Sequence, residues 1–181
     1  MKKLIALIAL PLAASIPTVA MADDKAGVYV GGGIGYGQST LNVKVEGNKA
    51  QVKTKDMRFN LHTGYRVNDY FAVEAGYYDL GNIKKDDFFN IKSQAFGLSA
   101  VGLIPLSDKI ELYGKAGTAK VTHSEKGHKE NGDALFFATG VNFSVTKDID
   151  LYGEAMHMNT QLHKTAKIDN TTANVGIRFN F

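Results

Sequence analysis

Apolar and polar residues alternate along many stretches of this chain, most clearly from residue 57 onward. Met57, Phe59 and Leu61 occupy every second position, and polar residues lie between them. After a short polar segment the same period returns in residues 71–77. A period of two places successive side chains on opposite faces of a β-strand, so this region predicts a hairpin of two strands.

The same pattern predicts strands along the whole chain, over residues 26–38, 56–66, 70–79, 92–104, 110–121, 134–145, 149–158 and 170–181. Tight turns are expected at Val67–Asp69, Leu106–Lys109 and Thr146–Asp148. Long polar loops are expected at residues 39–55, 80–91, 122–133 and 159–169. Short and long connections in alternation are typical of bacterial outer-membrane barrels. The predicted fold class is all-β, an eight-stranded antiparallel up-and-down transmembrane β-barrel, which leaves no unpaired strand edge in lipid.

Alternation fits a membrane barrel with apolar residues outside, and also a soluble, lipocalin-like barrel with apolar residues inside. The polar face carries several glycines and five charged residues in mid-strand, which form a candidate interior charge cluster: Arg58, Glu74, Lys115, Glu154 and Arg178. Small residues leave room for such side chains in a narrow interior, where opposite charges can pair. The membrane barrel is therefore favoured.

This interpretation assigns two sets of residues to the outer face. The lipid-facing set includes Phe59, Leu61, Phe71, Val73, Phe137, Val141, Ile177 and Phe179. The second set consists of tyrosines, which are enriched where a barrel meets the membrane interfaces. Candidates for these girdles are Tyr65, Tyr70, Tyr77, Tyr113 and Tyr152.

The first residues have the three parts of a secretory signal peptide. Lys2 and Lys3 precede an apolar run, and Ala20-Met21-Ala22 supplies small residues at the cleavage site. A membrane anchor helix is the competing interpretation, but prolines interrupt the apolar run before it reaches the roughly 20 residues that a spanning helix needs. We therefore expect residues 1–22 to be cleaved and residues 23–181 to form one barrel domain.

Composition excludes several functions. Cleavage removes two lysines and leaves 19 basic against 18 acidic residues, so the mature chain lacks the strong positive charge of a nucleic-acid-binding protein. The chain has no cysteine, which excludes thiol catalysis and thiolate metal sites. No cofactor is expected.

The final strand carries a family resemblance. Its apolar positions alternate up to the last residue, and they are Val175, Ile177, Phe179 and Phe181. Together with the glycine-rich opening Val28–Tyr36 and the segment Pro105–Tyr113, this strand resembles the OmpA-like and opacity-type small outer-membrane barrels. The resemblance implies a Gram-negative outer-membrane protein with extracellular loops, whose last strand is an assembly signal for the barrel-assembly machinery. The peptidoglycan-binding domain of full-length OmpA-type proteins has no counterpart here, so a cell-wall tether is not expected.

The resemblance also implies a role for the interior charges, because charged side chains across the lumen of OmpA-like barrels resemble a gate. The alternative is that these charges only neutralise one another, since eight strands enclose little more than side chains. We favour the structural role.

The predicted loops carry many lysines, which would face lipopolysaccharide or solvent. They could bind phosphates or acidic polymers through contacts that salt weakens. Ordinary solvated loops are the simpler interpretation. The candidate anion-binding residues are Lys49, Lys53, Lys84, Lys85, Lys126 and Lys129.

Histidines suggest two further sites, neither of which we favour. His123, His128, His157 and His163 lack a recognised zinc spacing, so no metal site is expected. His123-Ser124 lacks an orienting carboxylate that the sequence can place, so no catalytic residues are expected. We predict a monomeric, non-enzymatic protein with a structural or surface-interaction role such as adhesion to a host or cell-surface ligand. A small porin-like diffusion channel gated by the interior charges is the alternative.

Overall fold

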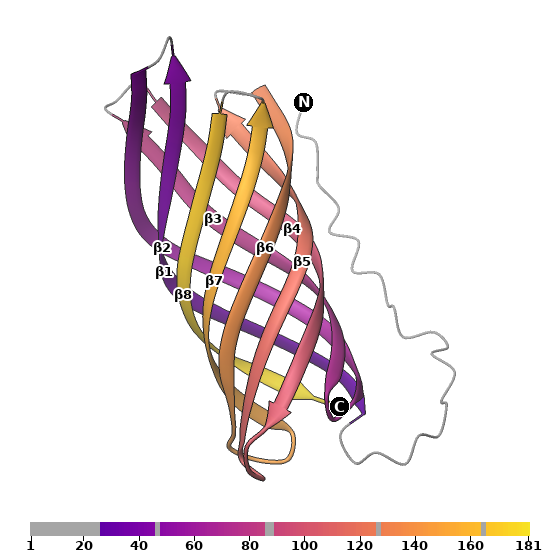
Figure 1. The fold of residues 1–181 in the computed structure, drawn as a ribbon. Helices are drawn as coiled ribbons and strands as arrows, with labels where there is room; N and C mark the ends of the chain where they lie inside the picture. The colour runs from indigo at the N-terminus through magenta and orange to yellow at the C-terminus, as the bar shows by residue number, and fades with distance from the viewer. Residues whose placement is uncertain (1–25, 46–47, 86–88, 126–127, 164–165) are drawn as a thin grey trace, which may run out of the picture.

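The chain forms a closed barrel of antiparallel strands in a computed structural model (Figure 1). The structure describes residues 26–181 except 46–47, 86–88, 126–127 and 164–165. Side chains are likewise not described for residues 41–52, 83–91, 125–129 and 161–167. The strands are β1 (Gly27–Val45), β2 (Asn48–Asn68), β3 (Phe71–Lys85), β4 (Phe89–Pro105), β5 (Ile110–Glu125), β6 (His128–Ser144), β7 (Ile149–His163) and β8 (Ala166–Asn180).

Each strand pairs with its neighbour in sequence, and β8 closes the sheet by pairing with β1. Gly33 of β1 lies opposite Gly176 of β8 at this closing seam. The predicted eight-stranded up-and-down barrel is therefore confirmed. In the described residues, no helix has the length and apolar character needed to cross a membrane.

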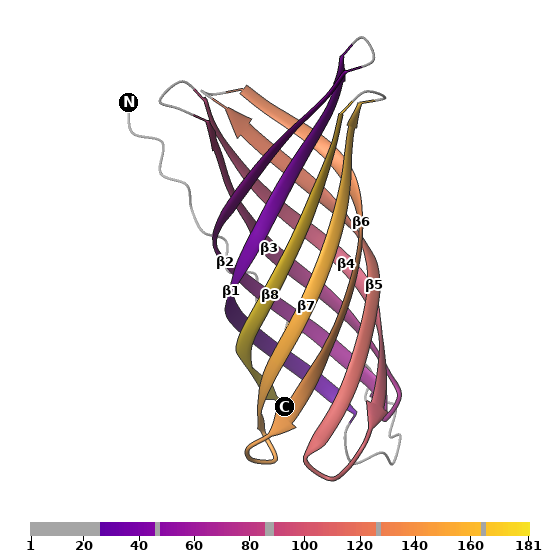
Figure 2. The ribbon, with the colours of Figure 1, turned by 60° about the vertical axis from the view of Figure 1, so that its left-hand side comes forward.

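The two ends of the barrel differ in how far the strands extend (Figure 2). We call one end the short-turn end, because residues 69–70, 106–109 and 145–148 connect the strands there. The sequence predicted a turn at each of these places, but Val67 and Asn68 of the first belong to β2. The C-terminus lies at this end as well (Figure 2). The other end, where four pairs of strands extend furthest from the barrel, is the hairpin end.

The prediction of four long loops was wrong. Most residues of the predicted loop 39–55 belong to β1 and β2, and the register continues to the pair Lys44 and Lys49. The other three predicted loops are also mostly strand. Within 39–55, Leu41, Val43 and Val45 continue the period of two on β1, so the sequence contains a strand signal that the many polar residues of this segment obscured.

The outer face forms an apolar belt, and all eight residues predicted to face lipid are exposed there. Two of the predicted girdle tyrosines are not in this belt. Tyr113 and Tyr152 are 3% and 4% exposed and point into the barrel. Glycines leave the space that these two rings occupy. A Cβ on Gly140 would lie 2.5 Å from the Tyr113 hydroxyl, and one on Gly176 would lie 2.5 Å from Tyr152 Cζ, which is too close for either side chain.

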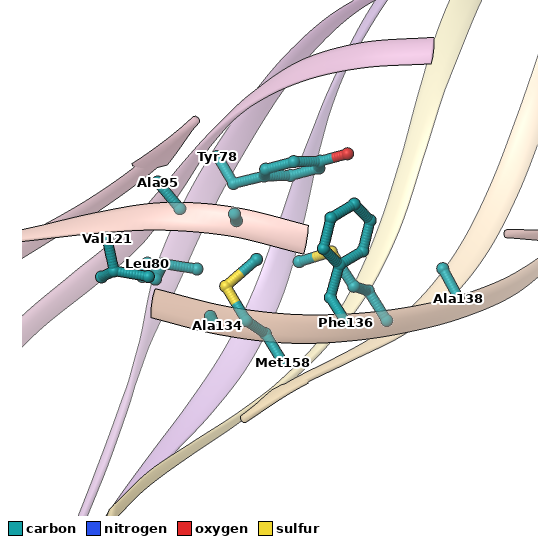
Figure 3. Close-up of a cluster of buried hydrophobic side chains, with 10 residues drawn as sticks. Tyr78, Leu80, Ala95, Val121, Ala134, Phe136, Ala138 and Met158 are labelled. Atoms are coloured by element: carbon teal, nitrogen blue, oxygen red, sulfur yellow. The ribbon is translucent and has the colours of Figure 1, made fainter. Parts of the chain in front are cut away.

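The interior also contains apolar side chains that the sequence pattern did not predict. A buried group near the hairpin end, here called the apolar cluster, places the ring of Phe136 beside that of Tyr78 with 5.5 Å between centroids (Figure 3). The cluster consists of Tyr78, Leu80, Ala95, Ala119, Val121, Ala134, Phe136, Ala138, Met156 and Met158. This part of the lumen is therefore packed like the core of a soluble protein.

Two adjacent phenylalanines allow a test of which strand face points inward. Phe136 is 0% exposed, and Phe137 is 60% exposed on the outer wall. We expect Phe136→Ala to lower the free energy of unfolding by about 3–5 kcal/mol, since it leaves a cavity. Phe137→Ala should cost less, because lipid or detergent fills the space. Urea unfolding in micelles, followed by far-UV circular dichroism, measures both. Equal losses would contradict the assigned inner and outer faces.

Candidate functional site in the lumen and at the hairpin end

Three charged residues meet at the centre of the barrel and form the group here called the charge triad. Glu74 of β3, Lys115 of β5 and Glu154 of β7 point inward from alternate strands. Lys115 Nζ lies 2.7 Å from Glu74 Oε1 and 2.7 Å from Glu154 Oε2. At most 2% of each side chain is exposed. One ammonium group therefore bridges two buried carboxylates.

Neutral side chains donate further hydrogen bonds to both carboxylates of the charge triad. Tyr29 donates its hydroxyl to Glu74 Oε2 at 3.1 Å, and Tyr113 donates to Glu154 Oε2 at 3.0 Å. The Asn174 amide donates to Glu154 Oε1 at 3.4 Å. A buried ion pair is tolerated when such partners offset its loss of hydration. The inward-facing tyrosines are thus part of the charge network.

Arg178 lies beside the charge triad but stacks on aromatic rings. Its guanidinium carbon is 4.4 Å from the centroid of the Tyr29 ring and 5.7 Å from that of Tyr113. These rings attract the cation through their electron-rich faces. The same two tyrosines therefore link Arg178 to the carboxylates that they contact.

Arg58 forms a separate network nearer the hairpin end. Its Nε atom donates to Asp56 at 3.1 Å, and its terminal nitrogens donate to Thr172 at 2.9 Å and Ser39 at 2.7 Å. Ser39 in turn donates to Asn170 at 2.7 Å. The sequence reasoning missed Asp56, although its position two residues before Arg58 places both on one strand face.

A third polar network, also not predicted, lies at the short-turn end. Arg66 pairs with Glu111 at 2.7 Å, and Asn142 donates to Glu111 at 3.0 Å. Asp150 accepts a hydrogen bond from Ser144 at 2.7 Å and another from Asn180, near the C-terminus, at 2.9 Å. Arg66, Glu111 and Asp150 lie at strand ends, where the sequence gives little sign of which way a side chain points.

The structure separates the predicted histidines. His123 is buried and shares a 2.8 Å hydrogen bond with Ser93, whereas His157 is exposed on the outer wall beside Thr171. Burial lowers the pKa of His123, although Glu130 opposes this shift. The described residues contain no group of three metal-ligating side chains. The structure does not describe the side chains of His128 and His163.

Few of the predicted anion-binding lysines have described side chains. Lys53 is exposed on the outer face of β2, and Lys55 and Lys92, which were not among the candidates, are also exposed. Lys49, Lys84, Lys85 and Lys129 lie in strands of the hairpin end, but their side chains are not described, and Lys126 lies outside the described residues. All four predicted assembly residues are exposed. Val175, Ile177 and Phe179 lie on the outer face of β8, and Phe181 is the final residue.

The charge triad leads to a stability prediction. Replacing Lys115 with methionine leaves two carboxylates buried without their cation, which should cost about 3–5 kcal/mol of unfolding free energy. Lys120→Met is the matched control, because Lys120 pairs with Asp133 where both side chains are mostly exposed. Solvent screens that pair, so the control should cost about 0–1 kcal/mol. Similar losses in the two variants, measured by urea unfolding, would contradict the prediction.

Comparison with known proteins places this geometry in context. A profile of the outer membrane protein beta-barrel domain matches residues 5–181. Curated proteins gave no match. Among solved structures, Neisserial surface protein A is 21% identical with a TM-score of 0.59, covering 86% of this chain and 97% of its own. OprG from Pseudomonas aeruginosa is 14% identical with a TM-score of 0.56, covering 88% and 98%.

A third similar structure is Ail, the attachment invasion locus protein of Yersinia pestis, in complex with the heparin analogue sucrose octasulfate. It is 18% identical with a TM-score of 0.51, covering 86% of this chain and 99% of its own. At such identities these structures show the fold alone, whereas the family profile spans nearly the whole chain. The match confirms the resemblance seen in the sequence, and the chain belongs to the outer-membrane β-barrel domain family.

Proposed function

We propose that this protein is a non-conducting, non-enzymatic barrel that presents its hairpin end at the cell surface for interaction with other molecules. The observation that carries this proposal is the filled lumen. Eight strands enclose only enough space for side chains. Here the charge triad occupies the middle of that space, and the apolar cluster packs the part nearer the hairpin end.

The two layers oppose ion flow in different ways. At the charge triad, each carboxylate oxygen already has a partner, so a passing ion would have to break those contacts. In the apolar cluster, Phe136 and Met158 have 0% exposure and offer an ion no ligand. Stripping an ion of its water without replacement ligands is costly.

Several observations support the proposed placement in the envelope. Short turns inside and longer hairpins outside are the usual orientation of bacterial barrels. Residues 1–22 have the pattern of a secretory signal, and the apolar face of β8 is available to the barrel-assembly machinery during biogenesis. The belt then contacts the bilayer, and the residues above it contact lipopolysaccharide. Closure of β8 on β1 favours a monomer, because it leaves no strand edge in the membrane.

Among the described residues, the one hydrogen-bonded serine–histidine pair supports the non-enzymatic assignment, because no third group orients its base. Ser93 and His123 are hydrogen-bonded, but the other ring nitrogen of His123, Nε2, has no partner among the described residues. A serine nucleophile requires a base that a third group orients. Both residues are also buried, which keeps a substrate from Ser93.

A gated channel is the second candidate, and one observation favours it. Polar atoms near the charge triad lack partners among the described residues, including Asn60 Nδ2, His62 Nε2 and Arg178 Nε. Such atoms are the usual partners of buried water. If Lys115 released one carboxylate, water at these positions could extend into a path.

Conductance in a planar lipid bilayer separates the two candidates. We expect the folded protein to show no discrete current steps, because both layers of the lumen are closed. A gated channel would instead show steps that change in Glu74→Ala and Lys115→Ala. Lys120→Ala, on the outer wall, is the control variant. Heat-modifiable gel mobility verifies folding, and steps in the folded wild-type protein would contradict the non-conducting proposal.

The exposed lysines of the hairpin end suggest acidic polymers as surface ligands. Lys53, Lys55 and Lys92 are exposed, and no ion pair is recorded for them among the described residues. Ail, a protein of the same fold, binds a heparin analogue, although at 18% identity this does not identify a ligand here. The lysines themselves support the proposal, because ammonium groups attract sulfates when salt is low.

A heparin column tests this ligand class. The double variant Lys53→Ala and Lys55→Ala should bind about three- to tenfold more weakly than wild type at low salt, with smaller differences at high salt. The double variant Lys109→Ala and Lys147→Ala removes the same charge from the short-turn end and should bind like wild type. Equal binding of both double variants would refute a role for the hairpin-end lysines.

A further inference from the structure

The outer wall of the barrel contains a hollow of about 860 Å³ that the proposed function does not use. Its sides are the exposed side chains of Phe96 and Leu98 on β4, and of Leu135 and Phe137 on β6. Thr118 of β5 lies between them. The hollow faces away from the lumen, because these residues alternate with buried ones along their strands.

The strand register explains why the wall is hollow here. Leu98, Thr118 and Leu135 are direct partners across β4, β5 and β6. In the next row toward the short-turn end, Ala116 lies beside Phe137. Thr118 is therefore recessed between two leucines, and Ala116 has the small Ala100 on one side and Phe137 on the other. Adjacent strands lie about 4.8 Å apart, so the two sides are separated by roughly 10 Å, which leaves the width of one hydrocarbon chain.

This trough continues along the wall toward the middle of the apolar belt. A second hollow of about 590 Å³ shares Leu98 and Thr118 with the first. Its other lining residues include Ala75, Ala100 and Ala116. A linear chain lying over Thr118 thus has an apolar surface to follow beyond the first hollow.

The opposite end of the trough is polar. Lys120 follows Thr118 on the outer face of β5 and forms an ion pair with Asp133 of β6. The side chains of Lys120 and Asp133 are 75% and 78% exposed, so both keep hydrogen-bonding capacity for a ligand. Asn131 and Asn159 line the same end. Asn131 accepts a hydrogen bond from Thr122 and keeps its amide N–H groups, whereas Asn159 donates to Asp169 and keeps its amide oxygen. The hollow is therefore amphipathic, with one cation, one carboxylate and two amides above an apolar trough.

We propose that this hollow binds a phosphorylated glycolipid of the lipid A type, with one acyl chain in the trough. The Lys120 ammonium matches a phosphate group, and carboxylate and amide side chains can bond sugar hydroxyls in both directions. A plain phospholipid offers the chain and the phosphate but few hydroxyls for Asp133 and the two amides. The inference deepens the proposed contact with lipopolysaccharide and rests on the proposed orientation for its role in the cell.

Native mass spectrometry of the purified protein in detergent micelles tests the site, with diphosphoryl lipid A, phosphatidylethanolamine and phosphatidylglycerol as probes. We expect lipid A to be retained about fivefold or more over either phospholipid. Thr118→Leu fills the trough and Lys120→Ala removes the cation, so each should lower lipid A retention by about fivefold or more. Neither change affects the lumen.

Two control variants make the result specific. Ala173→Leu adds more bulk than Thr118→Leu, but on the outer face of β8, outside both hollows, and Lys147→Ala removes a lysine from the short-turn end. Both should retain lipid A like wild type. Equal retention of all three lipids, preference for a phospholipid, or unchanged retention in Thr118→Leu would overturn the inference. Micelles impose no orientation, so a negative result leaves the proposed surface function standing.

Discussion

Closure of the hydrogen-bonded sheet between β1 and β8 is the constraint on which the rest of the structure depends. A bilayer offers no partners for backbone N–H and C=O groups, so a sheet in lipid must close on itself. Once it is closed, each strand has one face toward lipid and one toward the lumen. Phe59 and Arg58 illustrate the result, since neighbouring residues meet opposite environments. The alternating pattern in the sequence follows from this closure.

Closure with eight strands also makes the lumen narrow, and the interior residues are those that can fill it. Glycines such as Gly140 and Gly176 leave space for inward tyrosines. These tyrosines then hydrogen-bond the carboxylates that Lys115 bridges, so that the buried charges are satisfied. Packing and electrostatics are therefore coupled. A larger side chain at Gly140 would displace Tyr113 and thereby remove a partner of Glu154.

Sequence reasoning recovered the barrel and its lipid-facing residues, because lipid imposes a strict period of two on strands such as 57–66. It failed where polar residues are frequent or where a residue type suits either face. Lysines and other polar residues dominate 39–55, so this segment was predicted to be a loop, although Leu41, Val43 and Val45 keep the period of two. Tyrosine suits both a membrane interface and a crowded lumen, so the sequence placed Tyr113 in the girdle although its side chain points into the barrel. The pair Phe136 and Phe137 places an aromatic residue on each face, and pattern alone does not distinguish a dry lumen from a polar one.

The filled lumen determines where a ligand can act on this protein. Side chains that satisfy one another in the interior, as Lys115 and its two carboxylates do, have little capacity left for a substrate. Exposed groups have that capacity, among them the lysines of the hairpin end and the polar end of the trough on the outer wall. Lys120 belongs to the trough, at the end where its apolar lining gives way to polar residues. The two proposed ligands therefore call on different cations, the glycolipid on Lys120 of the wall and the acidic polymer on Lys53 and Lys55 of the hairpin end.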